Sequence, residues 1–300
     1  MDKGIERGIV LLAIGCPAYG NFAFNMAVSL REHSPNIPIQ LIYEEHAISH
    51  LNDWHRSFFD WLTVIEKDDS RYPDGKLFPA NAKLHLYEYS AFEKNIYFDV
   101  DGLVIKDITP LFDLCESAGG YFYSQMSGVY EIKEGKNNFP GLQWANVDDI
   151  KEYYQLEAGE VLPAINSSFQ YFTHSEESQV LFDQALSLLN NPIPISMHPQ
   201  KWGKKGFQPD ELYMDVALCK VNLVPELAGF KELIYFNTRR GDGLDTLKTK
   251  YYLLGLYGGI NFTHMSIRKM YDSELQRIFR VRGYGTHWFK IDNLMRQKIS

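Results

Sequence analysis

A short apolar run followed at once by a turn and a helical pattern constrains this chain more than any other feature. Residues 8–14 are almost continuously apolar and include β-branched side chains, which is typical of a strand buried on both faces of a parallel sheet. A turn follows at 15–20, and residues 21–33 carry apolar side chains at helical spacing and end before Pro35. This is the first half of a βαβ unit, so the sequence predicts an α/β sheet covered by helices.

The same alternation continues along the chain. Further strands are predicted at 37–43, 62–66, 94–98, 121–126 and 164–172, and helices at 80–92, 148–156, 176–189 and 210–220. There is no internal repeat and no long Pro/Gly/Ser linker. We therefore predict one domain over 1–265, followed by a basic and aromatic C-terminal extension over 266–300.

Composition narrows the class of protein. The 300 residues are 45% hydrophobic and 23% charged, no apolar stretch is long enough to span a membrane, and the first residues lack the layout of a signal peptide. These features predict a soluble, cytoplasmic protein. The three cysteines, Cys16, Cys115 and Cys219, are widely spaced, which predicts free thiols.

The net charge of −8 is unevenly distributed. From His264 onward the chain has eight Lys and Arg against three Asp and Glu, so this end carries +5 and residues 1–263 carry −13. The acidic average therefore does not exclude contact of the C-terminus with an anionic surface. A packed terminal helix with a solvated charged face explains the same pattern.

Two carboxylates follow the strand predicted at 94–98. Because side chains two residues apart on a strand point the same way, Asp99 and Asp101 should project together while Val100 faces inward. Ligands of open α/β sheets bind at this end of the strands, and paired carboxylates suit a divalent cation. A solvated strand end is the alternative interpretation.

The segment from Lys94 to Asp113 resembles the metal-binding segment of the family 8 retaining glycosyltransferases. Residues 82–86 resemble the Lys-Leu-His helix of the glycogenin branch of that family, and residues 165–168 resemble its Phe-Asn-Ser-Gly strand. The resemblance covers about residues 8–270. It implies a GT-A fold, a Rossmann-like nucleotide-sugar-binding mixed sheet flanked by helices, and a hexosyltransferase that uses a nucleotide sugar, in this family UDP-linked, with retention of configuration.

The resemblance also implies the roles of individual residues. Asp99, Asp101 and His264 would bind a metal, and the His nitrogen favours Mn²⁺ over Mg²⁺. Donor contacts would come from Ala13, Ile14, Tyr19, Lys83, Asp99, Val100, Asn166, Ser167 and Lys269. Tyr19 would stack on the base, and Lys83 and Lys269 would hold the diphosphate, with Arg268 as the alternative to Lys269 because the late motif lacks its glycine.

Asp210 and Glu211 occupy the place of the family's Asp-Gln pair at the anomeric centre. They would also suit the first turn of a helix that follows Pro209.

Two other functions fit parts of the pattern. A nucleotidyltransferase also uses paired acids and a metal, but residues 15–20 lack the basic side chain that a triphosphate loop needs. A non-catalytic nucleotide-sugar-binding protein fits the altered motifs, although Lys83, Asp99 and Asp101 are intact. The acceptor stays open between a glycan, a lipid-linked saccharide, a protein and a nucleic-acid base.

Overall fold

The computed structural model describes residues 5–73, 75–137, 145–191, 209–227, 233–235, 243–256, 265–286 and 288–289. The chain forms two compact units. The first is drawn from Met1–Lys67, Tyr89–Gly120 and Gly229–Ser300, and the second from Asp68–Glu88 and Tyr121–Ala228. No helix among the described residues is both long enough and apolar enough to cross a membrane.

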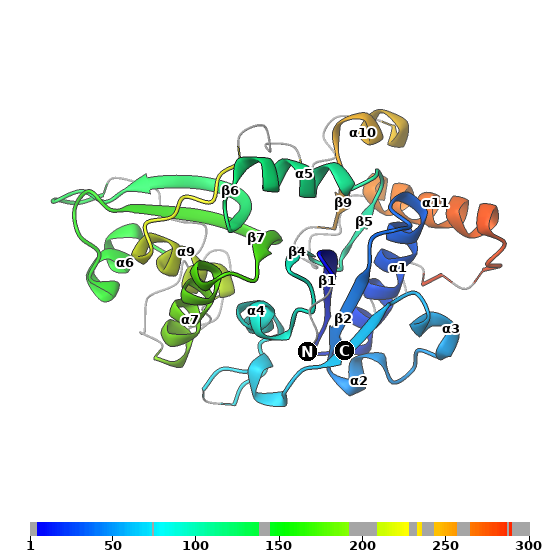
Figure 1. Ribbon diagram of the computed structural model, residues 1–300, viewed down its shortest axis with the longest axis horizontal. Helices are drawn as coiled ribbons and strands as arrows, with labels where there is room; N and C mark the ends of the chain where they lie inside the picture. The colour runs from blue at the N-terminus through cyan, green and yellow to red at the C-terminus, as the bar shows by residue number, and fades with distance from the viewer. Residues whose placement is uncertain are drawn as a thin grey trace. The chain divides into compact units, whose positions relative to one another are not determined.

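The first unit contains the predicted parallel strands (Figure 1). Their order is β3-β2-β1-β4, with bounds β1 Arg7–Ala13, β2 Ile39–Tyr43, β3 Trp61–Val64 and β4 Lys94–Phe98. Ile9 at the centre of β1 pairs with Ile39 on one side and Ile96 on the other, and all three are fully buried. The first βαβ unit is therefore confirmed, and its buried central strand explains the continuous apolar run.

The helix after β1 begins earlier than predicted. Helix α1 spans Pro17–His33, because proline is well suited to the first helical position, where no N–H donor is needed. Gly20 lets α1 approach α2 (Glu45–Ile48) closely, since a Cβ atom at Gly20 would lie 2.2 Å from the Ala47 carbonyl oxygen.

The remaining elements of this unit are shorter or come later in the chain. The other helices are α3 (Asp53–Arg56), α5 (Thr109–Ala118), α10 (Leu244–Lys250) and α11 (Met265–Arg282). A second, three-stranded sheet has the order β5-β9-β8, from Gly102–Val104, Leu253–Gly255 and Ile234–Tyr235.

The second unit is built on a long antiparallel pair, β6 (Phe122–Glu131) and β7 (Val161–Thr173). Its helices include α6 (Val147–Tyr154), α7 (Glu176–Asn190) and α9 (Asp210–Lys220). The segment predicted as one helix over 80–92 instead forms a 3₁₀ helix, η2 (Pro79–His85), and one α-helical turn, α4 (Leu86–Tyr89), after a short 3₁₀ turn, η1 (Lys67–Ser70). The first unit thus has four parallel strands and the second an antiparallel pair, which agrees with the predicted mixture of strand directions in an α/β fold.

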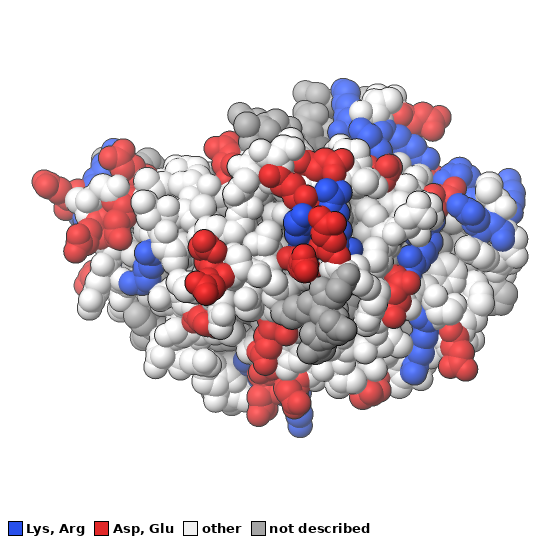
Figure 2. All heavy atoms as spheres, in the orientation of Figure 1, with Lys and Arg blue, Asp and Glu red and all other residues white. Residues whose placement is uncertain are grey.

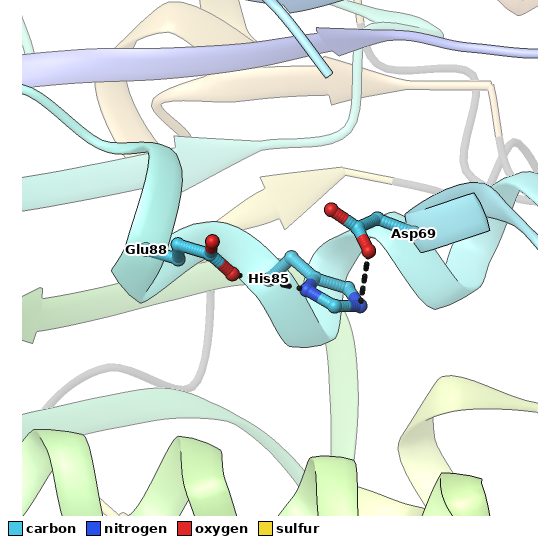
Figure 3. A group of neighbouring side chains, drawn as sticks. All are labelled: Asp69, His85 and Glu88. Atoms are coloured by element: carbon cyan, nitrogen blue, oxygen red, sulfur yellow. Dashed lines mark hydrogen bonds and ion pairs between the residues drawn. The ribbon is translucent and has the colours of Figure 1, made fainter. Parts of the chain in front are cut away.

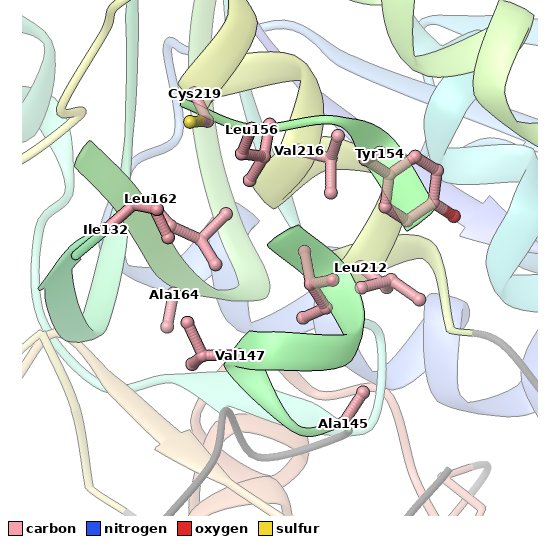
Figure 4. Close-up of a cluster of buried hydrophobic side chains, with 11 residues drawn as sticks. Ile132, Ala145, Val147, Tyr154, Leu156, Leu162, Ala164, Leu212, Val216 and Cys219 are labelled. Atoms are coloured by element: carbon pink, nitrogen blue, oxygen red, sulfur yellow. The ribbon is translucent and has the colours of Figure 1, made fainter. Parts of the chain in front are cut away.

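A buried apolar cluster fixes α9 within the second unit (Figure 4). Leu212, Val216 and Cys219 recur at helical spacing and pack with residues of α6 and β7, including Ile150 and Leu162. This stripe determines which face of α9 meets β7. The two acidic residues at the start of the helix are held by the same packing.

Helix α11 packs into the first unit through an apolar face. Tyr271, Leu275, Ile278 and Phe279 are fully buried, and the Asn25 amide donates to the Tyr271 hydroxyl at 3.1 Å. Basic side chains gather over α10 and α11 in Figure 2, but Arg277 and Arg282 form ion pairs with Glu32. The described part of the C-terminal end is thus a packed helix whose charges are partly neutralised.

Candidate functional site

Three residues predicted separately from the sequence meet in the second unit. The Lys83 ammonium of η2 donates to the Ser167 hydroxyl of β7 at 3.0 Å, and it lies 3.9 Å from a carboxylate oxygen of Asp210 at the start of α9. Only 3% of the Asp210 surface is exposed. An ammonium, a hydroxyl and a carboxylate held together in a largely buried position can bind the phosphate and sugar hydroxyl groups of a ligand.

Ser167 reaches Lys83 from an irregular part of β7. Gln125 of β6 pairs with Asn166, while the preceding residue Ser124 pairs with Gln170, so residues 167–169 are extra to the ladder. Within this bulge the Asn166 side chain accepts a hydrogen bond from the Ser168 N–H at 3.0 Å. Asn166 therefore shapes the turn of the bulge, and Ser167 points to Lys83.

Helix α9 carries three acids, one of which sequence analysis did not select. Asp210 and Glu211 lie in its first turn, as predicted, and Asp215 follows one turn later and is 1% exposed. Burial raises the pKa of Asp215 well above its ordinary value, a hydrogen bond from the Ile165 N–H opposes that rise, and the charges of Glu211 and Asp210 add to it.

The paired acids Asp99 and Asp101 lie in the first unit, in the bend between β4 and β5. Both are partly exposed, whereas Val100 between them is buried. The Tyr97 hydroxyl donates to Asp99 at 2.5 Å, so Asp99 continues the side-chain alternation of β4 and is oriented by a neighbour. Two accessible carboxylates, one of them fixed by a second residue, fit a divalent cation.

The turn after β1 is held by residues beyond β2. Gly15 has a positive φ of 90°, and its N–H donates to the buried Glu44 carboxylate at 2.9 Å, while His46 bonds to its carbonyl oxygen. Ala13 and Ile14 are buried, and the Ala13 carbonyl oxygen accepts a hydrogen bond from the Glu44 N–H at 3.1 Å. Glu44 was not predicted, and its position directly after a strand was the only sequence signal.

Of the other residues predicted to bind the donor or the metal, the structure describes Tyr19 and Lys269 but not His264. Tyr19 is in the first turn of α1 and is partly exposed. Lys269 is exposed on α11, while the adjacent Arg268 is half-buried. His264 lies outside the described residues, and the next residue in the chain begins α11.

A third acidic group surrounds His85 in the second unit (Figure 3). One ligand atom each from Asp69, His85 and Glu88 lies within 4.8 Å of the other two. Asp69 is 3.7 Å from the Nε2 atom of His85, whereas Glu88 is 3.4 Å from Nδ1. Because one ion bonds only one ring nitrogen, this arrangement offers an ion His85 and one carboxylate, with the other carboxylate orienting the ring.

No protein-family model matches this chain, and no curated protein does. Among solved structures, the galactosyltransferase LgtC in complex with donor and acceptor sugar analogues is 15% identical with a TM-score of 0.51, over 89% of this chain and 94% of that chain. The WbbM bifunctional glycosyltransferase is 10% identical with a TM-score of 0.56, over 100% of this chain and 53% of that chain. At these identities the likeness concerns the fold, and the chain has the GT-A fold that the sequence predicted.

Proposed function

We propose that this protein is a metal-dependent glycosyltransferase that moves a hexose from a UDP-linked sugar to an acceptor with retention of configuration. The contact of Lys83 with Ser167 and Asp210 carries the proposal. These residues come from three separate segments, and the sequence resemblance implies a donor-binding or anomeric role for each of them. The fold that the chain shares with LgtC and WbbM supports the same function.

In this proposal the metal ligands are Asp99, Asp101 and His264. A bound Mn²⁺, or Mg²⁺ in its place, would neutralise charge on the diphosphate leaving group. The Tyr97 hydroxyl holds Asp99 in one orientation, as outer residues do for metal-binding carboxylates.

The proposed donor contacts are those that the sequence resemblance implies. Tyr19 stacks on the uracil base, and the backbone around Ala13 and Ile14 and the residue Val100 line the nucleotide. Lys83 and Lys269 pair with the diphosphate. Asn166 and Ser167 contact the sugar.

Asp210 and Glu211 serve the anomeric centre. The bond from the anomeric carbon to the diphosphate oxygen breaks, and the acceptor oxygen bonds the same face of that carbon. The acceptor's proton goes to the departing diphosphate, and a carboxylate stabilises positive charge on the sugar ring. Asp210→Asn and Glu211→Gln separate the two roles, because the residue nearer the ring should show the greater loss of kcat.

The direct test is a panel of nucleotide sugars, with release of the free nucleotide measured in the presence and absence of Mn²⁺. We expect slow, Mn²⁺-dependent hydrolysis of one or two UDP-sugars. Lys83→Ala should lower kcat/KM by about tenfold or more, since a charged hydrogen bond contributes about 1.5–3 kcal/mol. Lys220→Ala, an exposed lysine of the same unit, is the control and should leave hydrolysis unchanged.

Binding of UDP with Mn²⁺ but no hydrolysis of any donor would instead indicate a non-catalytic binding protein. The proposal also includes a cytoplasmic location, and its acceptor is one of the four classes named in the sequence analysis. A donor preference found in the panel would narrow the acceptors to be tried next.

A further inference from the structure

The bulge in β7 is closed by side chains of other elements. At its base the Ser124 hydroxyl of β6 donates to the carbonyl oxygens of Phe169 at 2.8 Å and Asn166 at 3.2 Å. A bulge leaves backbone groups without their usual ladder partners, and β-bulges near functional sites re-aim a side chain. Here the side chain within the bulge is Ser167, which reaches Lys83.

On the other side of Asn166, the backbone of β7 is held by α9. The Ile165 N–H donates to the Asp215 carboxyl group at 2.9 Å, so a side chain supplies an acceptor that a neighbouring strand would supply in a regular ladder. Ile165 lies between the two places where the β6–β7 register shifts. The contact therefore fixes the strand where the bulge begins.

Asp215 is buried close to two other acids of α9. It is 1% exposed, and the charged groups that influence it, Glu211 and Asp210, are acids of its own helix. Burial and the charges of these two acids raise its pKa, which lowers the cost of burying a third acid beside them. A protonated carboxyl group still accepts the Ile165 hydrogen bond through its carbonyl oxygen.

We propose that Asp215 is a positioning residue: its contact with Ile165 holds the β7 bulge and so places Ser167 against Lys83. The inference rests on the proposed function, because Ser167, Lys83 and Asp210 are assigned there to the donor sugar and diphosphate. Helix α9 then positions two partners of Lys83, Asp210 directly and Ser167 through the strand.

The test compares Asp215→Asn with Asp215→Ala. Asparagine keeps a neutral acceptor of the same shape, so kcat/KM for UDP-sugar hydrolysis should stay within about threefold of the wild type. Alanine removes the acceptor, and misplacement of donor-binding groups by about 1 Å should lower kcat/KM by about 10- to 100-fold. Glu274→Gln, which removes a buried charge in the other unit, is the control for lost stability and should leave kcat/KM unchanged.

Hydrogen exchange of the peptide containing residues 161–170 provides a readout that needs no substrate. Exchange of the Ile165 amide should be faster in Asp215→Ala and unchanged in Asp215→Asn. If Asp215→Ala does not fold, Ser124→Ala opens the bulge from its other side and should show the same loss of kcat/KM.

Two results would overturn the inference: wild-type exchange and kcat/KM in a folded Asp215→Ala variant, or equal impairment of both Asp215 variants. If the wild type hydrolyses no nucleotide sugar, the proposed function fails instead. The exchange measurement still decides in that case whether Asp215 holds the strand.

Discussion

A buried carboxylate can stabilise or destabilise a fold according to its partners, and this chain contains one of each kind. Glu274 on α11 is fully buried and accepts hydrogen bonds from Lys248 at 2.9 Å, Arg277 at 2.9 Å and His33 at 3.2 Å. Burial opposes its ionisation, but the bonds from His33, Arg277 and Lys248 outweigh burial and hold its pKa well below the ordinary value.

Replacing the charged Glu274 side chain should therefore lower the stability of the folded protein. We expect Glu274→Gln to lower the free energy of unfolding by about 2–3 kcal/mol at pH 7, because three donors lose their charged acceptor. A folded-state pKa below the unfolded value gives stability that is present above the ordinary pKa near 4.5 and is lost in acid, so the difference should shrink as the pH falls below 4.5. Urea unfolding at several pH values measures it, with the exposed Glu131→Gln as a control that should change little.

Asp215 represents the opposite case. Its folded-state pKa lies above the ordinary value near 3.8, so between those two values the folded protein holds a proton that the unfolded chain releases. Stability from this residue is thus present in acid and falls as the pH rises through that window. Asp215→Asn does not titrate, and we expect it to gain stability relative to the wild type by about 1 kcal/mol per pH unit within the window. Thermal unfolding at pH 4.5, 6 and 8 would show this trend, and a constant difference would contradict it.

At the scale of elements, sequence periodicity predicted the long or strongly apolar segments well. β4 and α9 have the predicted bounds, and β1 differs by one residue at each end. The prediction of one helix over 80–92 was wrong, because a 3₁₀ helix and a single α-helical turn together imitate the spacing of one helix. Elements of two to four residues, such as β5 and β9, are too short to show a period.

The candidate site, too, could be predicted only in part from the sequence. Lys83 and Asp210 were identifiable from local motifs, and their contact is a result of packing between η2 and α9. The bulge that brings Ser167 to Lys83 depends on the pairing of β6 with β7, which no local pattern encodes. Asp215 was overlooked for the same reason, since its role depends on a strand fifty residues away in the sequence.

The approach of α1 to α2 provides a prediction at this scale. Gly20→Ala should destabilise the protein by about 1–3 kcal/mol, because the new Cβ atom meets a backbone carbonyl oxygen and the helices must move apart. Gly135→Ala is the matched control, since a Cβ atom there meets nothing within 4 Å. Equal unfolding midpoints for the two variants in urea would show that the helices separate at no cost.

At the scale of the whole molecule, the structure of α11 explains part of the uneven distribution of charge along the chain. Along α11 the exposed residues Lys269, Ser273, Gln276 and Arg280 recur at helical spacing, and Arg277 and Arg282 are paired with acids. The C-terminal segment from His264 onward has a net charge of +5, and its described part is therefore a solvated helix face rather than a dense basic surface. Contact of the C-terminus with an anionic surface stays a prediction, and Lys290, Arg296 and Lys298 lie outside the described residues.

The assignment of the metal is also a question for the whole molecule, because the part of the chain that the structure describes has two acidic groups that could bind an ion, one in each unit. Asp99 and Asp101 are in the first unit, and Asp69, His85 and Glu88 are in the second. The first group has two accessible carboxylates on one bend, whereas the two carboxylates around His85 face different ring nitrogens. Catalysis should therefore depend on the first group.

We expect Asp101→Asn to lower Mn²⁺-dependent UDP-sugar hydrolysis by at least about 100-fold at fixed Mn²⁺, since loss of a charged ligand removes several kcal/mol of leaving-group stabilisation. His85→Asn should keep the wild-type dependence on Mn²⁺, because the ring it removes holds no catalytic ion. A titration of rate against Mn²⁺ for the two variants distinguishes the groups. The reverse pattern, in which His85→Asn abolishes the Mn²⁺ response and Asp101→Asn retains it, would assign the catalytic metal to Asp69, His85 and Glu88.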